Sequence, residues 1–178
     1  MTGVQTCALP IFGAWLPLFS GNKDDYKWIR ESVEMCCDGV DAKIGWHFCF
    51  GNAWGNDILS ANFPQGYQTV LPYFWNTEGV DEFVLDYANR GMDGVDFLKN
   101  CPKNKGVQVG ILDIRTTMVE TPNVVAERVR KALKALSPEQ LTPSTDCGMK
   151  PLARMVAKLK LKALAEGTAI VRKEIGAG

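Results

Sequence analysis

Segments of strand pattern alternate with segments of helical pattern along this sequence, and short connections join them. The strand pattern is clearest over residues 43–50, where large apolar side chains recur at every second position. Three further strands are predicted over residues 83–87, 107–114 and 141–147. Strands that alternate with helices in this way predict parallel pairing with right-handed crossovers, and hence an α/β fold.

Helical periodicity fills the intervals between the strands. Apolar residues recur at helical spacing over residues 24–38, and again after Thr121, which forms an N-cap ahead of a first-turn proline. Shorter helices are predicted over residues 67–76 and 92–100, and a long amphipathic helix over residues 150–175. A basic amphipathic helix can bind membranes or calmodulin. We expect this one instead to cover the sheet with its apolar stripe and to expose its basic side chains, Lys160 among them, to water.

Polar and thiol side chains gather where the predicted strands end. They are His47, Cys49, Asp86, Asp113, Asp146 and Cys147. The carboxyl ends of parallel strands are where α/β barrels and doubly wound sheets bind their ligands. Because no glycine-rich phosphate loop follows any of the strands, the barrel is favoured. The 178 residues are too few for a whole barrel, which needs about 250, so we predict about four β/α units of a (β/α)8 barrel of the TIM type.

Residues 1–11 resemble the translation of a common short-read sequencing adapter. The alternative is a secretory signal, but the segment has no basic start, no convincing apolar stretch and no clear cleavage site. We therefore interpret residues 1–11 as an adapter-derived artefact and leave Cys7 out of the functional analysis. Residues 12–178 are then expected to be the C-terminal part of a longer protein, which makes the predicted half-barrel the C-terminal half.

The composition excludes several classes of function. The 20 basic side chains balance the 20 acidic ones, which argues against binding to nucleic acid or to an anionic membrane surface. No apolar run approaches the about 20 residues that a membrane-spanning helix needs. The six cysteines lack regular spacing, which is typical of reduced thiols in the cytoplasm. We expect a cytoplasmic globular protein with no nucleic acid or membrane partner.

One imidazole and two thiols form a candidate metal site. His47 and Cys49 are two residues apart on one strand and share a face, and Cys147 follows the last predicted strand. A set of nitrogen and sulfur ligands is the type that zinc prefers. The alternative for a strand cysteine is core packing, since free cysteine is among the most buried residue types. The shared position at strand ends favours the metal site.

An ordered set of motifs resembles the C-terminal catalytic domain of the cobalamin-independent methionine synthase family over residues 24–164. The motifs are His47-x-Cys49, Phe83-Val84-Leu85-Asp86, Val109-Gly110-Ile111-Leu112-Asp113, Val119-Glu120-Thr121-Pro122 and Asp146-Cys147-Gly148. The resemblance implies a (β/α)8 barrel with zinc at its rim. It also implies transfer of a methyl group from a donor, methyltetrahydrofolate or another, to the thiol of homocysteine, which gives methionine.

The zinc ligands of the family correspond to His47, Cys49 and Cys147, with a fourth ligand at Asp86. The family has glutamate at this fourth position, so aspartate is a departure by one methylene group. A second departure is Arg115, which stands where folate-dependent members have a histidine suited to proton donation. Arginine does not titrate usefully, so the identity of the methyl donor stays open. We also assign Asp113 a candidate catalytic role, with hydrogen bonding across the rim as the alternative.

Two alternatives to methionine synthesis remain open at this stage. A related barrel enzyme could alkylate another thiol, such as that of coenzyme M, with the same zinc–thiolate chemistry. The chain could also be an inactive truncated fragment, and we expect no turnover from it alone.

Other notable side chains are interpreted as structural. Cys36 and Cys37 are expected to pack in the core, because adjacent helical residues point differently and cannot both join one metal. Cys101, at the end of a helix, is also interpreted as structural. Three tryptophans could line a pteridine pocket, but aromatic residues more often pack in cores. They are Trp46, Trp54 and Trp75.

Overall fold

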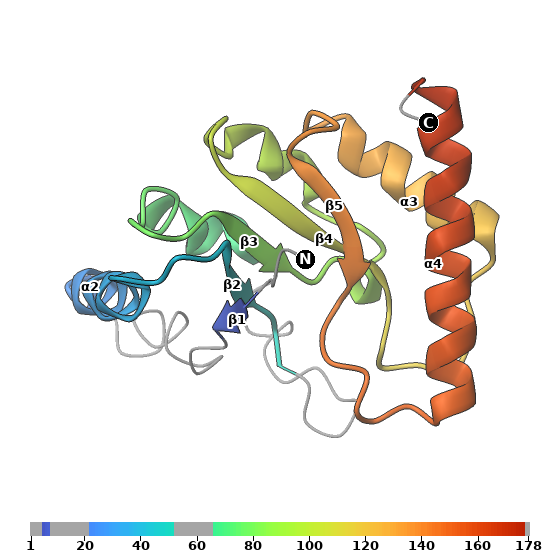
Figure 1. Ribbon diagram of the computed structural model, residues 1–178, viewed down its shortest axis with the longest axis horizontal. Helices are drawn as coiled ribbons and strands as arrows, with labels where there is room; N and C mark the ends of the chain where they lie inside the picture. Colours follow the sequence, from blue (N-terminus) through green and yellow to red (C-terminus); the bar gives the residue numbers. More distant parts are fainter. Residues whose placement is uncertain (1–4, 8–21, 52–65, 177–178) are drawn as a thin grey trace.

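The computed structural model describes residues 5–7, 22–51 and 66–176, arranged around a parallel sheet (Figure 1). The strand order is β1-β2-β3-β4-β5, with every neighbouring pair parallel. The strands are β1 (Gln5–Cys7), β2 (Ile44–Phe48), β3 (Glu82–Leu85), β4 (Gly106–Leu112) and β5 (Leu141–Thr145). From β2 onward, each strand pairs with the next one along the chain, so each connection is a crossover of the β/α type. The predicted α/β alternation is confirmed.

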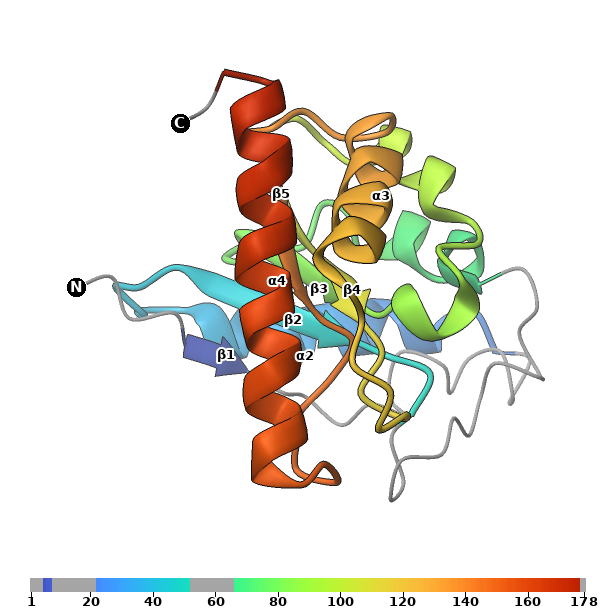
Figure 2. The ribbon, with the colours of Figure 1, turned by 90° about the vertical axis from the view of Figure 1, so that its right-hand side faces the viewer.

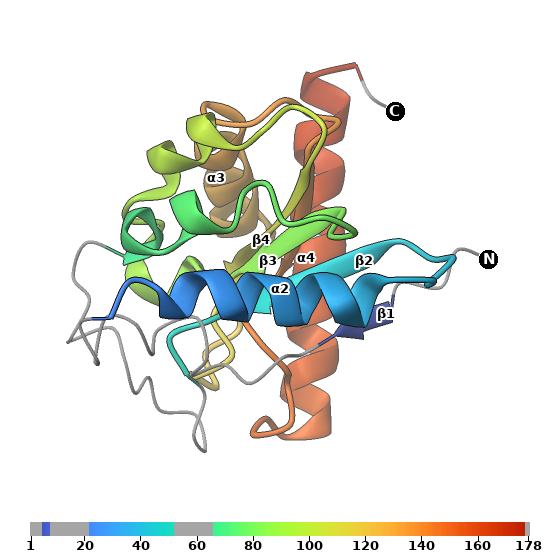
Figure 3. The same ribbon diagram turned by 90° about the vertical axis from the view of Figure 1, so that its left-hand side faces the viewer.

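Three α-helices in the described residues accompany the sheet. They are α2 (Asp25–Cys37), α3 (Pro122–Leu133) and α4 (Arg154–Glu174). Figure 3 shows α2 running alongside β2 at one side of the molecule, and Figure 2 shows α3 and α4 next to each other at the opposite side. The hydroxyl of Thr121 accepts a hydrogen bond from Val124 N at 3.3 Å, which confirms the predicted N-cap. No helix in the described ranges combines the length and apolar character required to cross a membrane.

The core forms between the sheet and these helices because β2 and α2 each turn an apolar face inward. Trp46 and Phe48 of β2 pack their rings on Phe74, at centroid distances of 4.9 Å and 5.5 Å. Four side chains of α2 enter the same core, namely Tyr26, Ile29, Val33 and Cys37. The other face of β2 presents His47, which is only half-buried. The alternation in the sequence thus separates a packing face from a face available for chemistry.

Two predicted short helices are replaced by 3-10 turns. The first region forms the turns Gly66–Thr69 and Leu71–Tyr73, because Pro72 has no N–H to continue an α-helix. In the second region only Val95–Asn100 is helical, again as a 3-10 helix. Met92 at φ 67° and Gly94 at φ 75° hold the preceding backbone in the left-handed region, which an α-helix cannot include.

Residues 5–7 pair with β2, in the register Gln5 to Ile44. No strand is predicted for this segment from sequence. The pairing uses main-chain N–H and C=O groups, so a strand edge accepts an extended segment largely without regard to its side chains.

Two expectations about individual side chains are wrong. Cys36 is exposed rather than packed, because the helical turn that buries Cys37 directs its neighbour toward solvent. Lys160 is fully buried rather than solvated, because Glu120 and a backbone carbonyl from another segment receive its ammonium group.

Candidate metal and thiol site

The predicted nitrogen and sulfur ligands meet at the carboxyl end of the sheet. His47 lies near the end of β2, Cys49 just beyond it, and Cys147 two residues after β5. The ligand atoms of the three side chains all lie within 4.8 Å of one another. Two strands separate β2 from β5 in the sheet order, and in a flat sheet the outer strands would stand about 14 Å apart. The sheet therefore curves, as a barrel wall does, and this curvature assembles the site.

The three side chains suit a tetrahedral zinc ion. Tetrahedral zinc with nitrogen and sulfur ligands places those ligand atoms about 3.5 to 3.8 Å apart, which the observed grouping accommodates. Nε2 of His47 is buried and has no hydrogen-bond partner among the described residues. A buried ring nitrogen without a partner is costly, and a metal ion would satisfy it.

The two thiols already interact as a pair. The hydrogen bond between Cys49 and Cys147 lowers the pKa of Cys147 to about 3, and the neighbouring His47 contributes in the same direction. The same hydrogen bond, together with burial and the charge of Asp86, raises the pKa of Cys49. One sulfur of the pair is thus stabilised as a thiolate, the form in which cysteine binds metals.

The structure does not place Asp86 in this group of ligand atoms. Asp86 follows β3 directly and is completely buried. The Tyr67 hydroxyl bonds to its Oδ1, while Phe50 N at 3.3 Å and Arg115 Nη2 at 2.7 Å donate to its Oδ2. Burial raises the pKa of Asp86, and these hydrogen bonds oppose the rise.

Arg115 connects this carboxylate to a second one. Its guanidinium donates to Asp86 at 2.7 Å, to the Gly51 carbonyl at 2.8 Å and to Asp146 Oδ2 at 3.4 Å. The side chain is only 7% exposed. From sequence, Arg115 is only the loss of a histidine, whereas in the fold it pairs with two buried carboxylates, those of Asp86 and Asp146.

Asp146 fixes the loop after β3, a role that sequence reasoning also missed. Its Oδ1 accepts the N–H groups of Tyr87 at 2.9 Å and Ala88 at 2.8 Å, and its Oδ2 accepts that of Asn89 at 2.8 Å. Burial, followed by the charge of Asp86, raises the pKa of Asp146 to about 7 against the effect of these donors.

A glycine on β4 makes room for this carboxylate. A Cβ on Gly110 would overlap Oδ1 of Asp146 and would lie 3.0 Å from the Leu85 carbonyl oxygen. In the sequence, the features that could have indicated the role of Asp146 are a glycine at position 110 and an aspartate directly before Cys147.

Asp113 occupies the turn that presents Arg115. Its Oδ1 accepts Arg115 N at 2.9 Å, and its own N–H donates to Glu120 Oε1 at 2.9 Å. This arrangement gives Asp113 a part in shaping the loop after β4, and its catalytic role stays a prediction.

Two of the three candidate tryptophans lie in the core. Trp46 and Trp75 pack on Phe83, at ring centroid distances of 6.4 Å and 5.0 Å, while Trp54 lies outside the described residues. Cys37 and Cys101 are buried, as predicted for structural cysteines.

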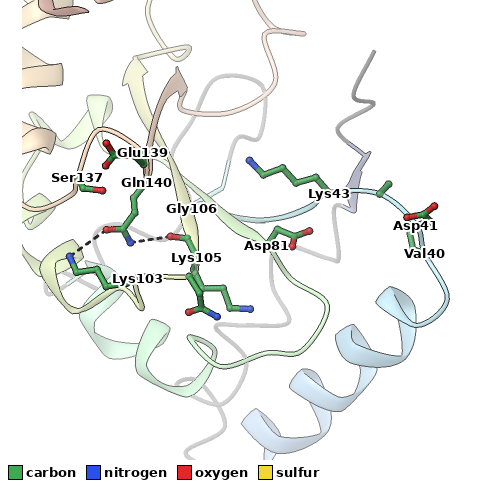
Figure 4. A pocket seen from close by; sticks show the side chains of 12 residues that line it. Val40, Asp41, Lys43, Asp81, Lys103, Lys105, Gly106, Ser137, Glu139 and Gln140 are labelled. Atoms are coloured by element: carbon green, nitrogen blue, oxygen red, sulfur yellow. Dashed lines mark hydrogen bonds between the residues drawn. The ribbon is translucent and has the colours of Figure 1, made fainter. Parts of the chain in front are cut away.

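A polar cavity of about 880 Å³ opens at the opposite, amino end of the strands (Figure 4). Two of its lysines are already engaged, because Lys43 pairs with Glu82 at 2.6 Å and Lys105 Nζ donates to the carbonyls of Thr77 and Val80. Since α/β barrels carry out their chemistry at the carboxyl end, this cavity is not the candidate site.

Comparisons with known proteins identify similar sequences. Residues 22–169 match the family described as cobalamin-independent synthase, catalytic domain. The chain is 32% identical to a methionine synthase of Saccharolobus solfataricus and 30% identical to one of Thermococcus kodakarensis, over 159 residues in each case. Each alignment covers 89% of this chain and 43% of the relative. The chain thus spans less than half the length of these relatives.

A solved structure matches the fold. The structure of a B12-independent methionine synthase from Shewanella sp. W3-18-1, in complex with selenomethionine, superposes with a TM-score of 0.80 at 28% identity. The match covers 98% of this chain and 50% of that chain. The prediction that the chain forms part of an α/β barrel is confirmed.

Proposed function

The chain belongs to the family of cobalamin-independent synthase catalytic domains, and on this premise we propose that His47, Cys49 and Cys147 bind zinc in a site for methyl transfer to the thiol of homocysteine. The observation that supports this most directly is the grouping of one imidazole and two thiols within 4.8 Å at the carboxyl end of the sheet. When bound there, zinc would favour the thiolate form of the acceptor, which is the nucleophile in methyl transfer.

The residues around the ligands prepare the site for this chemistry. His47 presents a buried nitrogen without a competing hydrogen bond among the described residues, and Cys147 is stabilised as a thiolate. Asp146 fixes the backbone after β3, directly beside Cys147 in the sequence, so the ligand stands on an anchored loop. A rigid arrangement of this kind reduces the entropic cost of aligning donor and acceptor.

On the family assignment we propose methyltetrahydropteroylglutamate or another methyl carrier as the donor. Arg115 cannot supply a proton to a leaving group because its guanidinium does not titrate usefully. In this chain it binds Asp86 and Asp146 instead. A proton for the leaving group would therefore have to come from another group. Asp113, which shapes the same loop, keeps its proposed catalytic role.

Zinc analysis of cysteine variants tests the proposal. The chain should bind one zinc per molecule, and Cys147→Ser and Cys49→Ser should each lose most of it, because a hydroxyl is a far poorer ligand than a thiolate. Cys36→Ser is the matched control, since Cys36 is exposed and away from the site, and it should keep full occupancy. Full zinc occupancy in Cys147→Ser would refute the assignment.

A further inference from the structure

The last helix holds the segment that joins β4 to α3. Lys160 of α4 is fully buried, and its ammonium group donates to the Met118 carbonyl at 2.5 Å and to Oε2 of Glu120 at 2.7 Å. Both acceptors belong to this one segment. Arg128 of α3 also contacts the glutamate, with Nη1 3.5 Å from Oε1, and donates to the Ile111 carbonyl at 2.5 Å. The Glu120 carboxylate therefore pairs with two cations, of which Lys160 is the closer.

Hydrogen bonds lead from this ion pair to the candidate site. Oε1 of Glu120 accepts the N–H of Asp113 at 2.9 Å, and Oδ1 of Asp113 accepts the N–H of Arg115 at 2.9 Å. The Arg115 guanidinium then donates to the Gly51 carbonyl at 2.8 Å. Gly51 lies two residues after Cys49. A continuous path of contacts thus connects α4 to the backbone that follows β2.

A close helix contact attaches α4 to the same region. A Cβ on Gly167 would lie 2.5 Å from the Pro122 carbonyl oxygen and 2.5 Å from Val125 Cβ. Pro122 and Val125 stand in the first turn of α3, directly after the segment that Lys160 holds. Because α4 contacts both this segment and the helix that follows it, the helix determines where the segment lies.

Stability alone does not account for a buried lysine–glutamate pair. The attraction between the two charges is largely offset by the cost of removing both from water, and an apolar pair of similar volume is often as stable or more so. Charge adds direction instead. The ammonium meets two acceptors of one segment, and the carboxylate accepts one particular backbone N–H. The pair therefore fixes the geometry of the segment.

We propose that Lys160 and Glu120 are positioning residues for the candidate site, because together they hold the turn that presents Arg115. The guanidinium of Arg115 reaches the Gly51 carbonyl and the Asp146 carboxylate, which neighbour the two proposed cysteine ligands in the sequence. A displaced turn would loosen the backbone beside both ligands. The effect on zinc rests on the proposed function, whereas the effect on the turn requires no metal.

Two variants of the 178-residue chain separate positioning from stability. Lys160→Met leaves Arg128 as the remaining cation of the Glu120 carboxylate. It should lower the free energy of unfolding, speed hydrogen exchange at the Arg115 N–H and weaken zinc binding about 10-fold. Lys160→Met combined with Glu120→Leu makes the pair apolar, and Arg128 keeps its bond to the Ile111 carbonyl. This double variant should regain the free energy of unfolding, while the faster exchange and the weaker zinc binding remain.

The Arg115 N–H is a suitable reporter because neither it nor its acceptor, the Asp113 carboxylate, is altered in these variants. Val33→Ala is the matched control, since Val33 is buried in α2 at the opposite side of the molecule (Figures 2 and 3). It should lower the free energy of unfolding and leave zinc affinity and exchange at Arg115 unchanged.

Two results would overturn the inference. One is a double variant that regains the original exchange rate and zinc affinity along with its stability. The other is a Val33→Ala chain that changes both readouts as much as Lys160→Met does. Failure of the unaltered chain to bind zinc would refute the proposed function instead, and exchange at Arg115 would then decide the role of Lys160 and Glu120 by itself.

Discussion

Lys160 of α4 is fully buried, and its ammonium group lies 2.7 Å from Oε2 of Glu120 in the segment that joins β4 to α3. The same ammonium donates to the Met118 carbonyl at 2.5 Å. Oε1 of Glu120 accepts the N–H of Asp113 at 2.9 Å. One buried ion pair therefore attaches the last helix to the loop at the candidate site.

We predict that Lys160→Met destabilises the fold by about 3 kcal/mol, because it leaves the Glu120 carboxylate buried and without its closest cation. Lys162→Met, on the same helix, is the control. Lys162 pairs with Glu166 at 3.6 Å, but both side chains are largely exposed, so its loss should cost less than about 0.5 kcal/mol. Urea unfolding of the two variants measures the difference, and equal effects would contradict the structural role of the buried pair.

A second prediction concerns the contact between α3 and α4. A Cβ on Gly167 would lie 2.5 Å from the Pro122 carbonyl oxygen and 2.5 Å from Val125 Cβ. Helix propensity alone predicts that Gly167→Ala stabilises α4 by about 1 kcal/mol. We expect a net destabilisation instead, because overpacking costs about 1 to 3 kcal/mol.

The control for this contact is Ala165→Gly, at an exposed position of the same helix. It should destabilise α4 by about 1 kcal/mol through propensity alone. Thermal melting of both variants decides the matter. A gain in melting temperature for Gly167→Ala would mean that the helices do not approach as closely as described.

The strands and long helices followed from sequence pattern because their signals are local. Alternation at β2 and helical spacing in α2 each depend on the residues of one segment, and both agree with the fold. The two short helices failed because Pro72 and Gly94 change the backbone in ways that apolar spacing does not reveal. In both places the backbone preferences of proline and glycine outweighed the helical spacing of the apolar residues.

The candidate site shows the same division between local and long-range information. The strand-end positions of His47, Cys49 and Cys147 follow from sequence, and the curved sheet brings them together. The pairing of Arg115 with Asp86 joins residues far apart in the chain. Nothing in either segment specifies the other partner, so only the folded arrangement could reveal the contact.

A third prediction is an alkaline loss of stability that depends on Tyr26. Burial, followed by the neighbouring Tyr73, raises the pKa of Tyr26 to about 12. The ring is stacked on Tyr73 at 3.9 Å, and its buried hydroxyl has no hydrogen-bond partner among the described residues. An unfolded tyrosine ionises near pH 10, so between about pH 10 and 12 the folded chain retains a proton that the unfolded chain releases. Stability therefore falls as the pH rises through this interval.

Tyr26→Phe removes this titration while keeping the ring. At pH 7 its free energy of unfolding should match that of the original chain, because no hydrogen bond to a described residue is lost. Above pH 10 the free energy of unfolding should fall less steeply with pH in the variant. The difference in slope should correspond to about one proton. Urea midpoints measured at pH 7, 10 and 11 provide the comparison, and parallel curves for the two chains would show that Tyr26 does not ionise differently in the two states.

The last prediction distinguishes the cysteines outside the site by their reactivity. Cys36 is exposed, whereas Cys101 is buried and burial raises its pKa to about 11. At pH 8 only about 0.1% of a thiol with this pKa is thiolate, the form that reacts with alkylating agents. Burial also keeps the reagent away from Cys101, so the two effects act together.

Iodoacetamide at pH 8 should therefore label Cys36 in the native chain and reach Cys101 only after unfolding in urea. Peptide mass spectrometry after timed quenching gives the two rates, and equal labelling of both thiols in the native chain would contradict the burial of Cys101.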